Sequence, residues 1–378
     1  MKRISKYKVD IGILVPIIVF FLVSVVSIYS TRRLLGSEFQ NLYIKQIIWY
    51  TIGLIFAYLV MFFGNRWLYN NAYIFYLVGV VSLVLVLFFG VTVKNATCWF
   101  RIPFLGTIQP SEFIKVIVII WLSCFYDKHQ KQLNKYSTSL FPICVCAGIA
   151  FLIFLQPDLG TMIIFVCIVA AIFFAVPISK EIKVKTTFAA LGFMLFAFVA
   201  FASSGKTLLQ ERQQERLKFT NPCADLLDSG NQVCNSYIAI NKGGLTGAGL
   251  GNSTQKYLYL PEPYTDFIYA VVVEELGLVA GVLLLIGYMI VLYRILIIGR
   301  NSPSNKGSAI CYGVAIYIFL HVAVNLMGIL GLMPMTGVPL PFISYGGSFT
   351  ICLIAALTAV QRVSVETALA KERSVKRA

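Results

Sequence analysis

Ten apolar segments of this chain are long enough, or nearly so, to cross the hydrocarbon core of a bilayer, about 30 Å thick, as helices. Lipid offers backbone polar groups no hydrogen-bonding partners, so such segments fold as helices that pack in a bundle. We therefore predict an all-α polytopic membrane protein with about ten transmembrane helices. Several segments are short or adjoin one another, and nine or eleven helices also fit. The segments are Ile11–Tyr29, Ile47–Phe63, Ala72–Val91, Glu112–Tyr126, Leu140–Leu155, Thr161–Val176, Thr187–Ala202, Phe267–Tyr293, Ala309–Leu332 and Phe342–Val360.

Composition and charge support the membrane assignment and give it an orientation. Hydrophobic residues make up 58% of the chain and charged residues only 12%, which excludes an ordinary soluble domain. With ten helices both termini lie on one side, and that side carries 19 of the 31 Lys and Arg residues. The positive-inside rule then places both termini in the cytoplasm. The net charge of +15 follows from this bias and from attraction to anionic lipid, and it requires no nucleic-acid partner.

The unusual chemistry lies in the loops of the opposite, extracellular face. We interpret residues 1–378 as a single membrane domain with one large extracellular loop over residues 203–265. Shorter polar loops on the same face are Lys94–Pro110, Gln156–Gly160 and Met333–Pro341. The long loop contains Cys223 and Cys234, which can form a disulfide if the compartment is oxidising, a question that the sequence leaves open.

The segment Leu258–Gly277 carries a cluster of carboxylates at the mouth of a membrane helix. Glu262 and Asp266 precede the apolar run, and Glu274 and Glu275 follow inside it. Ionisable groups are expensive to keep at such a position, so they usually mark transport or catalysis. We predict that Asp266 is a general base in a partly dry pocket. An N-terminal helix cap is the alternative role for Asp266, although a cap would not explain Glu262 or Glu274.

Glu112 and Lys115 lie one helical turn apart at the outer end of a predicted span. They can pair with each other, and Glu112 could also be an ordinary acidic residue at a helix start. Lys115 is followed only by uncharged residues until Asp127, so it heads into the bilayer and requires a carboxylate partner. We predict that this partner is Asp266.

Basic and aromatic residues of the extracellular loops are candidates for binding a phosphate. Trp99 is more simply explained as part of an interfacial aromatic belt. Arg101, and Arg212 in the long loop, carry the guanidinium group that suits phosphate, although the charged segment around Arg212 is also typical of a solvated amphipathic helix.

Two further features have structural interpretations. The glycine run Gly243–Gly251 follows no strand that a nucleotide-binding fingerprint requires, so we interpret it as a flexible turn near a bulky ligand. His321 and Asn325 are one turn apart in an apolar segment and are expected to form a buried polar pair between helices, worth about 1 kcal/mol.

Four distinctive sequence blocks follow one another along the chain. They are a Trp loop followed by QPSEFIK, QPDLGT at Gln156–Thr161, GGLTGAGLGNSTQKYLYLPEPYTDFIYAVVVEELG, and GLMPMTGVPLPFISYGGS at Gly331–Ser348. With these blocks the chain resembles the SEDS family of bacterial cell wall polymerases, which comprises FtsW, RodA and SpoVE. The likeness extends over essentially the whole chain, and the third block is closer to the form of FtsW, the division-associated branch.

The resemblance implies a glycosyltransferase of the bacterial cytoplasmic membrane that polymerises lipid II into peptidoglycan glycan strands at the outer face. It also implies a class B penicillin-binding protein as transpeptidase partner, among other membrane proteins of the division or elongation machinery. The catalytic aspartate of the family corresponds to Asp266, and its Trp, Glu and Lys correspond to Trp99, Glu112 and Lys115. Further substrate-binding residues are expected within the shared blocks at Gln156, Asp158, Glu262, Ser344, Tyr345 and Gly346.

The chain departs from the family pattern at two places. The family usually has Gly-Ala-x-Arg-Trp, whereas this chain has Asn95-Ala96-Thr97-Cys98-Trp99 and so lacks the glycine and the arginine. Tyr264 stands where His is common. We expect Arg101 to replace the missing arginine at the lipid phosphate.

The reaction implied by the resemblance inverts the configuration at the sugar, from an α-linked lipid diphosphate to a β-1,4-linked glycan. A single displacement requires a base on the acceptor hydroxyl, predicted to be Asp266, and positive charge at the departing diphosphate. That charge is predicted to come from Lys115, Arg101, and Arg212 or a divalent cation such as Mg²⁺ or Mn²⁺. The alternatives are a lipid II flippase or transporter, a scaffold of the division machinery, and a RodA-like role in elongation instead of division.

Overall fold

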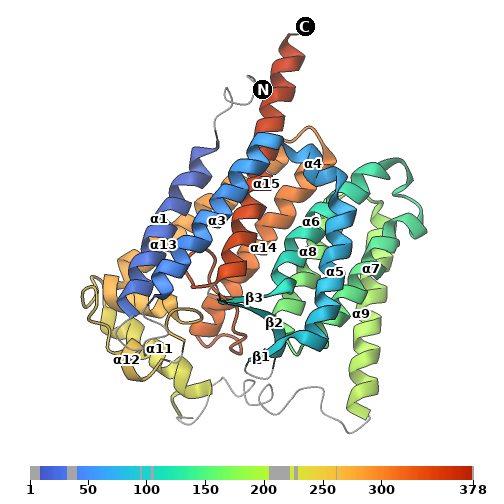
Figure 1. The fold of residues 1–378 in the computed structure, drawn as a ribbon. Coiled ribbons are helices and arrows are strands. Elements are labelled where there is room, and N and C mark those ends of the chain that lie inside the picture. Colours follow the sequence, from blue (N-terminus) through green and yellow to red (C-terminus); the bar gives the residue numbers. More distant parts are fainter. Residues whose placement is uncertain are drawn as a thin grey trace.

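The structure is a computed structural model, and it describes residues 9–31, 41–93, 96–103, 106–203, 222–224, 229–260 and 262–376 (Figure 1). The helices in chain order are α1 (Ile11–Thr31), α3 (Leu42–Phe63), α4 (Asn65–Asn70), α5 (Ala72–Phe89), α6 (Pro110–Lys128), η2 (Gln130–Gln132), α7 (Tyr136–Phe154), α8 (Leu159–Ala175), α9 (Lys180–Ser203), η3 (Pro222–Ala224), α11 (Ser229–Gly243), α12 (Gln255–Leu258), α13 (Ile268–Arg300), α14 (Asn305–Ile329) and α15 (Gly347–Val375).

These helices form the predicted membrane bundle. Each of the ten predicted segments falls on a helix, and within the described residues seven helices are long and apolar enough to cross a membrane. Helix α15 packs against α3, α13 packs against α14 and α1, and α14 also packs against α6 and α8. Large apolar side chains fill the interior and also cover the outside of α1, α3 and α5, as expected where lipid is the solvent. The predicted all-α polytopic fold is confirmed.

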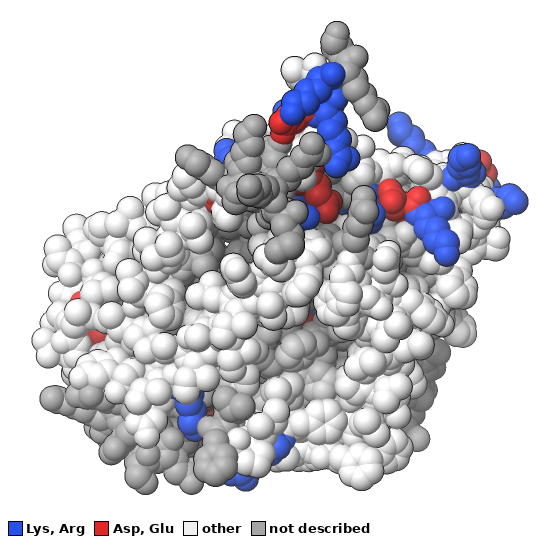
Figure 2. Space-filling view, turned by 45° about the horizontal axis from the view of Figure 1, so that its top comes forward, with Lys and Arg blue, Asp and Glu red and all other residues white. Residues whose placement is uncertain are grey.

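The start of the first helix and the end of the last helix lie at the same face of the molecule. Helix α1 begins and α15 ends at the upper end of the view in Figure 1. Figure 2 brings that end forward and shows Lys and Arg side chains gathered on it, above a largely uncharged flank. This distribution agrees with the predicted cytoplasmic location of the termini.

A small antiparallel sheet follows α5 on the opposite face, where the sequence analysis expected only a loop. Its strands β1 (Val91–Val93), β2 (Ala96–Ile102) and β3 (Gly106–Ile108) lie in the order β1-β2-β3. Four of the seven residues of β2 are β-branched or aromatic (Thr97, Trp99, Phe100 and Ile102), which favours an extended backbone. The pairing places Trp99 opposite Val91 and Arg101 opposite Thr107.

Helix α13 is broken at Gly277, where φ is 88° and ψ is 166°. The glycine run after α11 supplies the hydrogen bonds that the broken helix loses: the amides of Leu278 and Ala248 bond to the carbonyls of Gly244 and Glu274 at 2.9 and 2.8 Å. A Cβ on Gly277 would lie 2.2 Å from the carbonyl oxygen of Leu245, so only glycine permits this approach. The run therefore forms turns that are packed against α13, so the predicted flexibility was wrong, while its proximity to a ligand stays a prediction.

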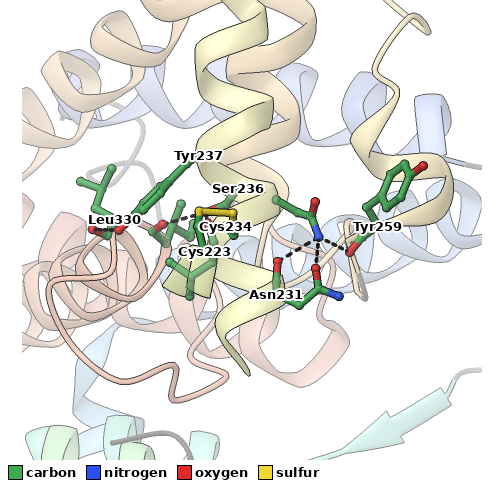
Figure 3. The surroundings of a disulfide bond; sticks show 10 residues. Cys223, Asn231, Cys234, Ser236, Tyr237, Tyr259 and Leu330 are labelled. Carbon is green, nitrogen blue, oxygen red and sulfur yellow. Dashed lines mark hydrogen bonds between the residues drawn. A yellow bond between two sulfur atoms is a disulfide. The ribbon is translucent and has the colours of Figure 1, made fainter. Parts of the chain in front are cut away.

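A disulfide joins Cys223 of η3 to Cys234 of α11, the pairing that the sequence left open (Figure 3). The next turn of α11 is bonded to the end of α14: Ser236 and Tyr237 donate to the carbonyls of Ile329 and Leu330, both at 2.8 Å. The disulfide thus ties η3 to α11 close to the point where α11 contacts the bundle.

Candidate functional site

Asp266 lies in a turn that leads into α13, and a second loop holds this turn in place. Helix α13 begins at Ile268 with Phe267 as its N-cap residue, so Asp266 does not have the capping position. Ser344 donates its hydroxyl to the carbonyl of Thr265 at 2.6 Å, and the amide of Tyr345 donates to the carbonyl of Tyr264 at 2.8 Å. Two predicted sequence blocks, 79 residues apart, therefore interlock directly at the predicted base.

The second loop is itself fixed from three helices. Its carbonyls at four consecutive residues each accept a hydrogen bond from a buried side chain of the bundle. The pairs are Tyr288 to Pro341, Tyr50 to Phe342, Ser24 to Ile343 and Gln46 to Ser344. Satisfying each of these buried carbonyls removes a desolvation penalty of about 1–3 kcal/mol and leaves the loop few alternative positions. The interlocked turn is consequently preorganised.

Asn325 on α14 and Gly337 in the Pro-rich loop complete the surroundings of Asp266. The Asn325 amide nitrogen donates to the carbonyls of Asp266 and Val338, each at 2.9 Å. Gly337 has φ of 71°, and a Cβ at this residue would lie 3.7 Å from Asp266 Oδ2. Asp266 is half-buried, so part of the residue remains accessible to solvent.

Glu112 and Lys115 form a buried ion pair, with Lys115 Nζ 2.7 Å from Glu112 Oε1. The predicted pairing of Lys115 with Asp266 was wrong. The ammonium is taken by Glu112 and by His321, whose Nε2 lies 3.0 Å away. Tyr317 donates its hydroxyl to the other oxygen of Glu112 at 3.2 Å. Lys115 has no exposed surface, so it is enclosed by this cluster and cannot touch a diphosphate in this conformation.

Glu262 and Tyr264 precede Asp266 in the same turn. Glu262 has φ of 59°, and the Thr265 hydroxyl donates to its carbonyl and carboxylate oxygens at 3.3 and 3.4 Å. Burial, and then the nearby Glu262 carboxylate, raise the pKa of Tyr264 above its ordinary value. Tyr264 therefore stays a neutral phenol that can donate a hydrogen bond.

The remaining predicted residues are distributed as follows. Trp99 is half-buried and Arg101 exposed on β2, so the Arg101 guanidinium is open to an anion.

Asp158 caps α8 through the amide of Thr161 at 3.0 Å, and it accepts a hydrogen bond from Gln109 at 2.9 Å. Gln156 is fully buried, and its side chain donates to the carbonyl of Leu83. The amide of Gly346 donates to the Gln46 side chain at 3.3 Å. Arg212 lies outside the described residues.

Glu274 and Glu275 of α13 anchor the segment around α12, residues 253–258. Glu274 accepts from the amide of Thr254 at 2.8 Å, at the start of α12. Glu275 forms a buried ion pair with Lys256, and Ser30 of α1 donates to the same carboxylate at 2.7 Å. These contacts account for two of the carboxylates that the sequence analysis placed near the site.

A divalent cation has no ready-made protein site among the described residues. They contain no group of three or more His, Cys, Asp and Glu side chains that could hold a metal ion. The side chains described here therefore do not fit a resident metal, and we derive no step through one.

Three residues of the site were not among the predicted site residues: His321 and Asn325, which were expected only as a buried polar pair, and Gly337. Two isolated polar residues at i and i+4 in an apolar helix were the available signal, because buried polar groups in a membrane helix require partners. Their partners, Lys115 and the Asp266 carbonyl, come from segments that are remote in sequence. Only the packing of α6, α13 and α14 identifies them.

Comparison with known proteins places this geometry in a family. The family model described as "Cell cycle protein", for FtsW, RodA and SpoVE, matches residues 7–369. The probable peptidoglycan glycosyltransferase FtsW of Enterococcus hirae is 32% identical over 385 residues, which cover 98% of this chain and 96% of that protein. The protein of the same name from Bacillus subtilis is 36% identical over 275 residues, covering 72% of this chain and 68% of that one.

A solved structure shows the same fold. It is described as "Structural coordination of polymerization and crosslinking by a peptidoglycan synthase complex", and its matching chain superposes with a TM-score of 0.74 at 24% identity. The match covers 94% of this chain and 97% of that chain. On the strength of the family match and of these relatives, the chain belongs to the FtsW/RodA/SpoVE family of multi-pass cytoplasmic membrane proteins.

Proposed function

We propose that this protein is an inverting glycosyltransferase that polymerises lipid II into β-1,4-linked glycan strands at the outer face of the cytoplasmic membrane, for cell division. Its relatives named FtsW, probable peptidoglycan glycosyltransferases, support the activity and the division role. The observation that carries the catalytic assignment is the position of the half-buried Asp266 in an interlocked turn. The carbonyl of Asp266 accepts from Asn325, the carbonyl of Thr265 accepts from Ser344, and a Cβ on Gly337 would lie 3.7 Å from the Asp266 carboxylate.

In the proposed reaction Asp266 takes the proton from the 4-hydroxyl of the acceptor sugar. The hydroxyl oxygen attacks the anomeric carbon of the donor from the face opposite the lipid diphosphate, the bond to the diphosphate breaks, and the configuration inverts. A base of this kind contributes about 10²–10⁴-fold to the rate. The fixed backbone around Asp266 supports this role, because a preorganised base does not have to be ordered at the moment of reaction.

The departing diphosphate requires positive charge, and we assign this role to Arg101 on β2, whose side chain is exposed. Arg212, which lies outside the described residues, is a second candidate. Lys115 does not contact the diphosphate in this proposal, because Glu112 and His321 enclose its ammonium. Trp99, Glu262, Ser344 and Tyr345 are proposed to shape the sugar-binding surface around the turn.

A class B penicillin-binding protein is the proposed partner, which would crosslink the strands as they are made. The structural relative was solved as a complex that combines polymerisation with crosslinking, and its fold extends over 94% of this chain. The single-domain organisation and the extracellular position of residues 203–265 are part of the same proposal.

The test is polymerisation of purified lipid II by full-length protein in detergent, with and without the cognate transpeptidase. We expect Asp266→Asn to lower the rate at least about 10²-fold at unchanged thermal stability. The matched control is Asp127→Asn, which alters an aspartate paired with Lys306 at 3.8 Å near the cytoplasmic end of α6.

Two results would overturn the proposal. An unchanged rate for Asp266→Asn would remove the assigned base. A wild-type protein that makes no polymer in detergent, but moves lipid II across a vesicle membrane, would favour the flippase. Depletion of the protein in cells separates a division role, which gives filaments, from an elongation role, which gives rounded cells.

A further inference from the structure

His321 occupies an unusual position for the only histidine described inside the bundle. It lies on α14, is 1% exposed, and contacts Lys115 of α6 through Nε2 at 3.0 Å. A Lys ammonium has only hydrogens to offer, so the bond requires a lone pair on Nε2. The ring is therefore neutral, with its proton on Nδ1.

Aromatic neighbours hold the His321 ring in this orientation. Phe349 of α15 stacks on it with centroids 4.6 Å apart, and Tyr317 meets it edge-on at 5.0 Å. The Tyr317 hydroxyl also bonds to Glu112 at 3.2 Å. The ring cannot rotate without disturbing both contacts, so Nε2 remains directed at the ammonium.

One turn further along α14, Asn325 holds the backbone of Asp266. Residues four apart on a helix lie on the same face, about 5–6 Å from each other. One face of α14 therefore binds the buried cation through His321 and the turn of the proposed base through Asn325. The spacing between the Lys115 cluster and Asp266 is set by a rigid helix.

We propose that His321 is a positioning residue of the transfer reaction: its Nε2 lone pair fixes Lys115 in register with Asp266 across α14. The inference rests on the proposed function, and it assigns no chemical step to the ring. Without the acceptor, the ammonium keeps only Glu112 and can shift toward other oxygens of the site. The position of the Lys115 ammonium relative to the Asp266 carboxylate is then no longer fixed.

The decisive comparison is between His321→Gln and His321→Leu in full-length protein. The Gln carbonyl oxygen can take the place of Nε2 as an acceptor, whereas Leu fills similar space without one. We expect His321→Leu to lower kcat about tenfold or more with little change in KM, and His321→Gln to retain most of the activity. The matched control is His129→Leu, which removes the other histidine of the chain, at the cytoplasmic end of α6.

A double-mutant cycle tests the contact without relying on turnover. Thermal unfolding of His321→Leu, Lys115→Met and the combined variant should show strong coupling, because each single change removes the same bond. Additive effects on the melting temperature would overturn the contact.

Equal loss or equal retention of activity in the Gln and Leu variants would overturn the positioning role. A wild-type protein without polymerase activity would overturn the proposed function and the positioning role with it, while the cycle would still report on the bond. If only the predictions for the His321 variants fail, while wild type polymerises lipid II and Asp266→Asn does not, the proposed function stands.

Discussion

The buried ion pair between Lys256 and Glu275 offers the sharpest test of how the segment around α12 is held on the bundle. The two side chains are 0% and 2% exposed, and Ser30 of α1 bonds to both of them at 2.7 Å. Replacing Glu275 by Leu leaves the Lys256 ammonium buried with a single hydroxyl as acceptor. Removing one partner of a buried pair costs about 3–5 kcal/mol, and solvent screening is negligible at this exposure. We expect Glu275→Leu to destabilise the protein by about this amount.

The same reasoning predicts recovery when both charges are removed. The combined variant Lys256→Met with Glu275→Leu leaves no buried charge, and apolar replacement of such pairs is often neutral. We therefore expect most of the lost stability to return, measured as the unfolding transition of the purified protein in detergent. The control is Glu181→Leu. It removes the ion pair between Glu181 and Lys185, whose charged atoms are 2.6 Å apart and whose side chains are 69% and 63% exposed. It should leave the transition unchanged.

Two outcomes would refute this reasoning. If Glu275→Leu unfolds at the same temperature as Glu181→Leu, burial does not give the pair its energy. If the combined variant is no more stable than Glu275→Leu, the loss comes from packing or from Ser30, and an unpaired ammonium is not its cause.

Two further predictions concern the backbone and the crosslink of the same face. Gly277→Ala should lower the melting temperature clearly, because its Cβ would lie 2.2 Å from a carbonyl oxygen at φ of 88°, whereas Gly192→Ala on α9, with nothing within 4 Å, should be neutral or slightly stabilising. An equal effect of the two changes would contradict the packing described for the break in α13. Cys223→Ser should cost about 2–3 kcal/mol for a loop closed over 11 residues, and Cys234→Ser should cause the same loss with no addition in the double variant. A wild-type protein whose stability is unaffected by reductant would show that the crosslink contributes nothing.

Much of the architecture follows from local rules. Each predicted apolar segment falls mainly on a helix, because a segment in lipid has to satisfy its own backbone hydrogen bonds. The segment Phe342–Val360 is an exception at its start, since α15 begins only at Gly347 and the residues before it form the loop beside Asp266. The short sheet at residues 91–108 was missed because strands of three to seven residues between two spans give little periodic signal. The break at Gly277 was missed for a different reason: the apolar run continues through it, and the hydrogen bonds that permit it come from Gly244 and Leu245.

By itself the sequence determined the membrane bundle, its orientation, and the carboxylate turn that contains Asp266, since hydropathy, charge bias and family blocks are properties of separate segments. Only the tertiary structure decided which charges meet. Lys115 had two acidic partners in prospect, and the packing of α6 on α14 assigned it to Glu112 and His321. The energy of a buried charge depends on its neighbours within a few ångströms, and those neighbours come from helices that are distant in the chain.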